Sequence, residues 1–282
     1  MIRKAKPASL AFLPLYLFTL VFVIGPLVLM LLLSFSPRDG WSYSAGFTLE
    51  NYTKILTDET YRNTFVTSLK LAALSTSAVI VLGYPFGLCT ALLPKKSAQF
   101  FVQAQMIPYW VNSLLRLYGW MIIFRANGLL DKLLMALGIT EEPLKLLYTY
   151  PAVVVGMIYV LLPFMFTSVY QVAQKLDLSL VEASRDLGAG KIYAFFSVIL
   201  PLTLPGLKTG IILTFIPSMG LFFIAQILGG SKIVLVGSLI EELLMKAHNQ
   251  PAAAALSVIL MLLTGLVCII LLRKPKWQRK IQ

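Results

Sequence analysis

The sequence predicts an all-α membrane protein with six membrane-spanning helices, on three observations. First, 58% of the 282 residues are hydrophobic, and the mean hydropathy is +0.82. Second, only 13% of the residues are charged, whereas a typical soluble domain has about 25%. Third, six mostly apolar segments are each long enough to cross a bilayer, which takes about 20 residues in a helix.

The six segments follow one another along most of the chain. We expect spans at Leu10–Leu33, Thr67–Leu93, Phe100–Phe124, Leu147–Tyr170, Pro205–Leu228 and Ala252–Leu272. The first follows basic residues, as a signal peptide does, but its apolar run is too long and no small-residue cleavage site follows it cleanly. It is therefore expected to remain as a helix. The third and fifth spans are the least uniform, because they contain polar or helix-breaking residues: Asn112, Arg116, Pro217 and Gln226.

The distribution of Lys and Arg predicts the orientation. Thirteen lie in the two tails, the 94–99 turn and the 171–204 loop, whereas eight lie in the other three loops. Because basic residues are enriched in cytoplasmic segments, both termini and the 171–204 loop are placed in the cytoplasm. The expected organisation is one transmembrane domain, 10–272, between short basic cytoplasmic tails at 1–9 and 273–282.

Several functional classes are disfavoured. The net charge of +12 would suggest nucleic acid in a soluble protein, but here the basic residues border apolar segments, so the lipid bilayer is the expected partner. Cys89 and Cys268 lie in apolar runs without metal-ligand spacing, so no metal site is expected. The chain has no G-x-x-x-x-G-K-[ST] motif and no catalytic constellation at membrane depth. We therefore expect no catalytic residues and no cofactor in this chain.

The 171–204 loop carries the strongest local pattern. Ser179 and Glu182 have capping-box spacing, which predicts a helix start, and Gly188 stands where a left-handed cap would end that helix. A second amphipathic helix follows, and Pro201 and Pro205 mark the entry to the fifth span. This helix–glycine–helix elbow suits either docking into a groove of a partner or lying on the membrane surface.

The elbow resembles the EAA motif of ABC importer permeases. The matching positions are Glu182, Ala183, Ser184, Gly188, Val198, Leu200 and Pro201, where Ser184 replaces Ala and Val198 replaces Ile. The resemblance implies the type I ABC importer permease fold, with the elbow as the coupling helix in a cleft of the ATPase. It implies that Glu182 makes the polar contact and Gly188 the turn. The ATPase-coupling residues are then Glu182, Ala183, Asp186, Gly188, Ala189 and Pro201.

Further segments narrow the resemblance. They are Phe47–Tyr52, Leu82–Phe86, Pro108–Gly119, Tyr159–Phe164 and Pro217–Phe222, and together they resemble PotB-type permeases of spermidine/putrescine importers over about residues 13–272. This implies a subunit of the bacterial inner membrane with a PotC-like second permease, a PotA-like ATPase homodimer that binds ATP and Mg, and a PotD-like extracytoplasmic binding protein. The same architecture also serves ferric ion, sulfate and other small solutes, so those substrates stay open.

A polyamine path requires carboxylates, carbonyl oxygens or aromatic faces. The candidate pathway residues are Tyr109, Trp110, Asn112, Ser113, Arg116, Tyr118, Tyr159, Met219 and Phe222. Arg116 would repel a cation, so either it pairs structurally, for instance with the partner subunit, or the third span begins later than drawn; the structural pairing is the favoured interpretation. The aromatic residues have alternative roles as interface-belt or packing residues. Five acids in the external loops (Asp131, Glu141, Glu142, Glu241 and Glu242) could form an electronegative vestibule, but ordinary loop roles are preferred.

A stand-alone secondary transporter is the remaining alternative. That class often shows charged residues within its spans and internal repeats. The sequence has no acidic residue in mid-span and no convincing repeat. The sequence therefore favours the importer permease.

Overall fold

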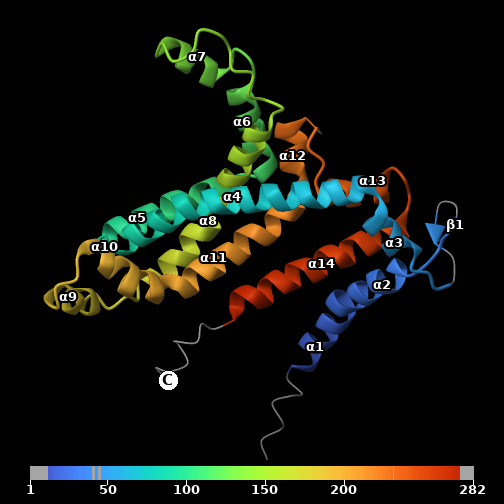
Figure 1. Ribbon diagram of the computed structural model, residues 1–282, viewed down its shortest axis with the longest axis horizontal. Helices are drawn as coiled ribbons and strands as arrows, with labels where there is room; N and C mark the ends of the chain where they lie inside the picture. The colour runs from blue at the N-terminus through green and yellow to red at the C-terminus, as the bar shows by residue number, and fades with distance from the viewer. Residues whose placement is uncertain (1–11, 40–41, 44–45, 231, 274–282) are drawn as a thin grey trace, which may run out of the picture. The chain divides into compact units, whose positions relative to one another are not determined.

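The computed structural model describes residues 12–39, 42–43, 46–230 and 232–273 (Figure 1). Those residues are mostly helical, which confirms the expected all-α class. The strands described are one two-residue antiparallel pair, β1 (Arg38–Asp39) and β2 (Ser42–Tyr43), and loops join the helices. Of the expected basic tails, 1–9 and 274–282 lie outside the described residues, as do the first two residues of the first expected span.

The chain divides into two compact units, residues 1–62 with 239–263 and residues 63–238 with 264–282. The first unit holds α1 (Leu13–Thr19), a π-turn (Leu20–Ile24), α2 (Gly25–Ser34) and α3 (Glu50–Thr57). The second holds α5 (Lys95–Met106), α6 (Ser113–Phe124), α7 (Leu129–Ala136), α8 (Tyr150–Ala173), α9 (Ser179–Asp186), α10 (Lys191–Ala194), α11 (Leu200–Gly220) and α12 (Phe222–Gly229). Three helices pass from one unit into the other: α4 (Glu59–Ala91), α13 (Val236–Met245) and α14 (Gln250–Leu272).

Five helices in the described part are long and apolar enough to cross a membrane. They are Leu13–Ser34, Glu59–Ala91, Tyr150–Ala173, Lys191–Gly220 and Gln250–Leu272. These correspond to the first, second, fourth, fifth and sixth expected spans, with α4 beginning eight residues earlier than expected. The helix α4 continues through Pro85 without interruption.

The third expected span, Phe100–Phe124, is wrong as one continuous helix. It is two 12-residue helices, α5 and α6, joined by a 3-10 turn over Ile107–Trp110. Pro108 sits in that turn, and the backbone is extended at Val111 and Asn112 before α6 begins. Each half is about 18 Å long at 1.5 Å per residue, which is shorter than the roughly 30 Å hydrocarbon core.

The fifth expected span, Pro205–Leu228, is shifted toward the N-terminus. Its helix begins at Lys191, runs through a π-turn at Phe195–Ile199 and ends at Gly220, after which α12 starts afresh. The N–H of Leu200 bonds to the carbonyl of Phe195, five residues back. This wider turn lets the helix pass Pro201, which has no N–H to contribute. The first span has a similar π-turn before Pro26, and its helix also continues through the proline.

In the second unit, α8 is contacted by several other helices. Figure 1 shows α11 running beside α8, and α12 and α6 also contact it. Small residues permit close approach: a Cβ at Gly87 of α4 would lie 2.8 Å from the carbonyl oxygen of Phe166, and one at Gly206 of α11 would lie 2.7 Å from that of Ser168. Membrane helices commonly use such small residues at their interfaces, so α8 has a neighbour in near-backbone contact on each of these faces.

Candidate functional site

The elbow between α8 and α11 begins with a capped helix, although the cap differs from the expected one. Ser179 is the first residue of α9 rather than its cap, and its backbone N–H donates a 3.0 Å hydrogen bond to the carboxylate of Asp177. Hydrogen bonds from the Ser179 hydroxyl and then from its N–H hold the pKa of Asp177 below its ordinary value. The side chain of Glu182 is exposed. The reciprocal Ser179–Glu182 capping box is therefore not formed.

The end of α9 agrees with the sequence. Gly188 has φ +88°, in the left-handed region. The N–H of Gly188 bonds to the carbonyl of Arg185 at 2.8 Å, and the N–H of Ala189 bonds to that of Ser184 at 3.0 Å. This pair of bonds is a Schellman motif, which needs a residue with positive φ at the position of Gly188. Gly188 therefore turns the chain from α9 into α10.

The elbow presents apolar side chains outward. Leu187 is 90% exposed and Ile192 is 76% exposed, and Tyr193 and Phe196 are exposed beside them. Ala189 and Pro201 are half-buried, whereas the other coupling residues expected from the sequence are exposed: Glu182, Ala183, Asp186 and Gly188. Several large apolar side chains exposed in one short segment, with charged residues beside them, are typical of a site of interaction.

The elbow is joined to the second span by a buried contact that the sequence did not reveal. The hydroxyl groups of Tyr84 and Thr203 lie 2.8 Å apart, and the Tyr84 ring meets Phe195 edge to face at 6.3 Å. Tyr84 is 7% exposed and Thr203 is fully buried. The sequence feature that could have indicated this contact is Tyr84 in the Gly83–Tyr84–Pro85 run, because its hydroxyl is a polar group on an otherwise apolar helix.

A second site lies where the third expected span is broken. A cavity of about 440 Å³ is bounded by the α5–α6 junction, α8 and the break between α11 and α12. It is lined by Tyr109, Val111, Asn112, Ser113, Arg116, Val160, Leu161, Phe164, Pro217, Leu221 and Phe223. Four of the candidate pathway residues therefore line one cavity, and none of the lining residues is acidic.

Arg116 is held in this cavity by aromatic rings. Its guanidinium carbon lies 4.9 Å from the ring centre of Tyr109 and 5.4 Å from that of Tyr159, both within the range of cation–π attraction. Tyr109 is fixed in turn by its hydroxyl, which donates to the carbonyl of Val160 at 2.9 Å. The Nε and Nη1 atoms of Arg116 are buried and have no hydrogen-bond partner among the described residues. Within the described part of this chain Arg116 therefore contacts aromatic rings and no acid, and its expected pairing with the partner subunit stays a prediction.

The other candidate pathway residues lie elsewhere or act differently. Asn112 lines the cavity but also caps α6, because its side-chain oxygen accepts from the N–H of Leu114 at 2.8 Å. Trp110 is 84% exposed and Tyr118 is 51% exposed, whereas Met219 is fully buried. Phe222 packs beside Phe223, and it is Phe223 that lines the cavity. Met219 and Phe222 therefore do not line this cavity, and their place in the pathway stays a prediction.

Asp131 does not contribute to an external electronegative vestibule. It is 2% exposed, and its carboxylate accepts from the N–H groups of Asn127 at 2.9 Å and Leu144 at 3.2 Å. It therefore holds the loop after α7 in place, in agreement with the structural interpretation.

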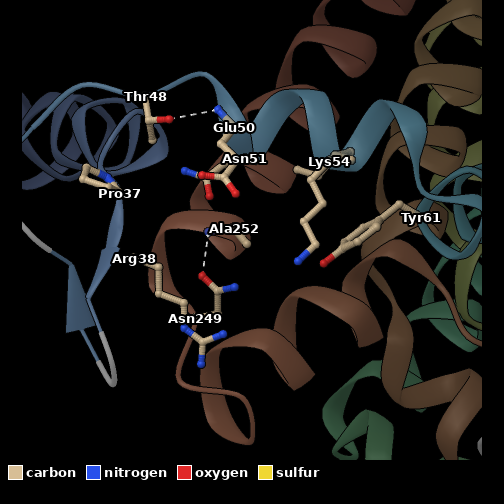
Figure 2. A pocket seen from close by; sticks show the side chains of 10 residues that line it. Pro37, Arg38, Thr48, Glu50, Asn51, Lys54, Tyr61, Asn249 and Ala252 are labelled. Carbon is tan, nitrogen blue, oxygen red and sulfur yellow. Dashed lines mark hydrogen bonds between the residues drawn. The ribbon is translucent and has the colours of Figure 1, made fainter.

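The first unit contains a polar pocket of about 200 Å³ that the sequence did not predict. Figure 2 shows the polar ends of Lys54 and Tyr61 pointing toward each other, and Asn249 lying near Arg38 and Ala252. Asn249 accepts from the N–H of Ala252 at 3.2 Å, and Arg38 donates to the carbonyl of Ala247 at 3.0 Å. These bonds fix the start of α14, so we assign the pocket a structural role.

Comparison with known proteins gives the family. Residues 83–274 match the model of the binding-protein-dependent transport system inner membrane component. The chain is 38% identical over 261 residues to the spermidine/putrescine transport system permease protein PotB of Escherichia coli K12, covering 92% of this chain and 94% of that one. It is 37% identical to PotB of Haemophilus influenzae, covering 93% and 92%, and 29% identical to the inner membrane ABC transporter permease protein YdcU of E. coli K12, covering 90% and 84%.

Solved structures agree on the fold. A bacterial ABC transporter that imports alginate matches with a TM-score of 0.73 at 13% identity, covering 93% of this chain and 92% of that one. The MetNI methionine ABC transporter matches with a TM-score of 0.55 at 20% identity, covering 76% and 96%. The chain therefore belongs to the family of binding-protein-dependent transport system inner membrane components, and it is an ABC transporter permease of the inner membrane rather than an enzyme.

Proposed function

We propose that this permease imports polyamines, such as spermidine and putrescine. The observation that carries the proposal is the 38% identity to PotB, which extends over nearly the full length of both chains. The aromatic cavity is consistent with a substrate that combines ammonium groups with apolar spacers. Ferric ion, one competing substrate, would favour anionic oxygen ligands, and none of the cavity-lining residues is acidic. Sulfate stays the competing substrate, because Asn112, Ser113 and Arg116 are hydrogen-bond donors in the same cavity.

The proposed topology has six crossings and cytoplasmic termini. Five crossings are the long apolar helices, and the third is the pair of half-helices α5 and α6. A broken helix at membrane depth is tolerated where its free backbone groups line a cavity, and the α5–α6 junction lines one. An even number of crossings places both basic tails on the same side, in agreement with the positive-inside rule.

The elbow is proposed to dock into the ATPase subunit. Its exposed Leu187 and Ile192 would fill an apolar groove, with Glu182 at the polar rim. A membrane-surface hairpin would instead favour basic residues beside the apolar ones. The elbow carries the bases Arg185 and Lys191 but also the acids Glu182 and Asp186, so it is not the uniformly basic surface that anionic lipids attract. The resemblance of the elbow to the EAA motif therefore favours a protein groove.

The proposed complex has four kinds of component. A PotC-like second permease completes the pathway, a PotA-like ATPase homodimer binds ATP and Mg, and a PotD-like protein delivers the substrate. This chain would carry no cofactor of its own. Support comes from the PotB similarity and from the fold shared with an alginate transporter that was solved with its periplasmic protein.

The substrate is tested by ATP hydrolysis in the reconstituted complex. The chain is co-purified with the permease, ATPase and binding protein encoded beside it and placed in lipid. Spermidine, putrescine, sulfate and ferric ion are then added in turn. Stimulation by the polyamines alone is expected, whereas stimulation only by sulfate or ferric ion would retain the importer and overturn the polyamine assignment.

Docking of the elbow is tested by charge reversal. Glu182→Lys is expected to lower the amount of ATPase that co-purifies with the permease at least several-fold. Glu141→Lys is the matched control, because Glu141 is also exposed but lies in a different loop. Equal recovery of ATPase with both variants would contradict the docking proposal.

A further inference from the structure

We propose that the guanidinium of Arg116 occupies an aromatic site that binds an ammonium group of the polyamine during transport. The ammonium group enters this site when the Arg116 side chain moves out of it. This inference rests on the proposed polyamine function and adds the location of a binding site, between Tyr109, which lines the cavity, and Tyr159, which lies beside it. Arg116 then keeps the site closed to cations in the resting permease.

The two rings form the cation site. Tyr109 comes from the turn between the two half-helices and Tyr159 from α8, and both ring centres lie within 5.4 Å of the Arg116 guanidinium carbon. Both rings are held independently of Arg116: the Tyr109 hydroxyl donates to the carbonyl of Val160, and the Tyr159 ring packs against Trp120 at 5.5 Å. The site therefore remains formed when the guanidinium leaves it.

Arg116 is held weakly compared with most buried arginines. A buried guanidinium is normally stabilised by a carboxylate and by hydrogen bonds to its nitrogens. Across the described ranges, Arg116 has no ion pair, its Nε and Nη1 atoms have no hydrogen-bond partner, and no cavity-lining residue is acidic. Its attachment in this chain is the pair of rings, and that same attachment is open to any cation of similar size.

The cavity has room for the exchange. Its volume of about 440 Å³ lies within the range of small-molecule sites, and Arg116 lines it. An ammonium group and the guanidinium cannot both occupy the space between the rings, because two unit charges at this separation repel strongly in a low-dielectric site. Substrate entry and withdrawal of Arg116 are therefore coupled.

The test is direct polyamine binding to the assembled importer in lipid nanodiscs, measured with radiolabelled spermidine and without the binding protein. Arg116→Gln empties the site and removes the repelling charge, so the Kd for spermidine is expected to fall roughly tenfold or more. Arg116→Lys, which retains the charge, is expected to stay near the wild-type Kd. Arg125→Gln is the control, because Arg125 is exposed and lies outside the cavity.

A second variant separates the shared site from general electrostatics. In the Arg116→Gln background, Tyr159→Leu is expected to reverse most of the gain in affinity, because it removes one ring of the site. A gain that persists without the ring would overturn the proposal. An unchanged or weaker affinity for Arg116→Gln would overturn it as well.

Two further outcomes separate the role of Arg116 from the choice of substrate. If Arg116→Gln dissociates the two permeases and Arg116→Lys does not, Arg116 pairs with an acid of the partner and the proposal is overturned. If the wild-type complex with its binding protein is not stimulated by polyamines, the proposed function itself fails. Polyamine stimulation combined with no gain for Arg116→Gln overturns only the inference about Arg116.

Discussion

The hydroxyl of Tyr84 in the second span lies 2.8 Å from the hydroxyl of Thr203, close to where the elbow enters the fifth span. Thr203 also donates to the carbonyl of Ile199 at 2.8 Å. Since the single hydroxyl hydrogen of Thr203 is used in that bond, Tyr84 is the donor to Thr203. This contact ties the membrane end of the elbow to a helix far away in sequence.

Tyr84→Phe is expected to destabilise the purified complex by about 1 kcal/mol, the usual net value of a buried hydrogen bond. The ring contact with Phe195 would remain. Thermal denaturation of the complex measures the effect, and Tyr170→Phe is the matched control, because the described residues give the Tyr170 hydroxyl no hydrogen bond while its ring stacks on Phe166. Equal stability of both variants would show that the bond contributes nothing.

Gly188→Ala is expected to reduce substrate-stimulated ATP hydrolysis. Nothing lies within 4 Å of a Cβ at Gly188, so the change acts only through the backbone, where a left-handed residue other than glycine costs about 1–2 kcal/mol. Gly190→Ala is a close control, because Gly190 also has open space but has φ −66°, which alanine adopts freely. A similar loss in both variants would contradict the assigned role of the left-handed turn.

Gly87→Ala is expected to destabilise the second unit by about 1–3 kcal/mol, because its new methyl group would meet the backbone carbonyl of Phe166, which cannot move away as a side chain would. The yield and melting temperature of the folded complex measure this. Gly265→Ala, where nothing lies within 4 Å, should leave both unchanged.

Asp177 provides a prediction about pH. Its pKa is lowered by the Ser179 hydroxyl and then by the Ser179 N–H, so the carboxylate stabilises the start of α9 at neutral pH. This stabilisation is lost only as the pH falls through the lowered pKa, below the ordinary value of 3.8. Ser179→Ala should raise the pKa toward that ordinary value, as measured by ¹³C NMR of the labelled carboxyl group. A pKa that does not move would remove the Ser179 hydroxyl as the cause.

Much of the elbow was predictable from the sequence because its signals are local. A glycine two residues after Asp186, at the end of an amphipathic run, predicts a left-handed cap, and Gly188 adopts one. The expected cap at the other end was wrong, because Asp177 and Ser179 are both good capping residues and only the backbone geometry decides between them. The first, second, fourth and sixth spans were predictable because a long apolar run in the sequence directly indicates a helix that crosses the lipid.

The third and fifth spans show what an apolar run does not report. Hydropathy does not distinguish a proline that breaks a helix from a proline that a wider helical turn accommodates. Pro108 lies at a break between α5 and α6, whereas Pro201 lies inside a continuous helix because the π-turn before it removes the conflict. The cavity follows from the first of these breaks, so its location could not be predicted, although four of its lining residues were pathway candidates.

The unbroken helix from Lys191 to Gly220 has a mechanical consequence. Its 30 residues span about 45 Å. It carries α10 of the elbow at one end and reaches the cavity near Pro217 at the other. If the elbow docks as proposed, a tilt of the whole helix by about 10° would move one end relative to the other by roughly 8 Å. The π-turn keeps the helix continuous past Pro201, and the helix also continues through Pro205 to Gly220, so a tilt imposed on the elbow would reach the cavity end.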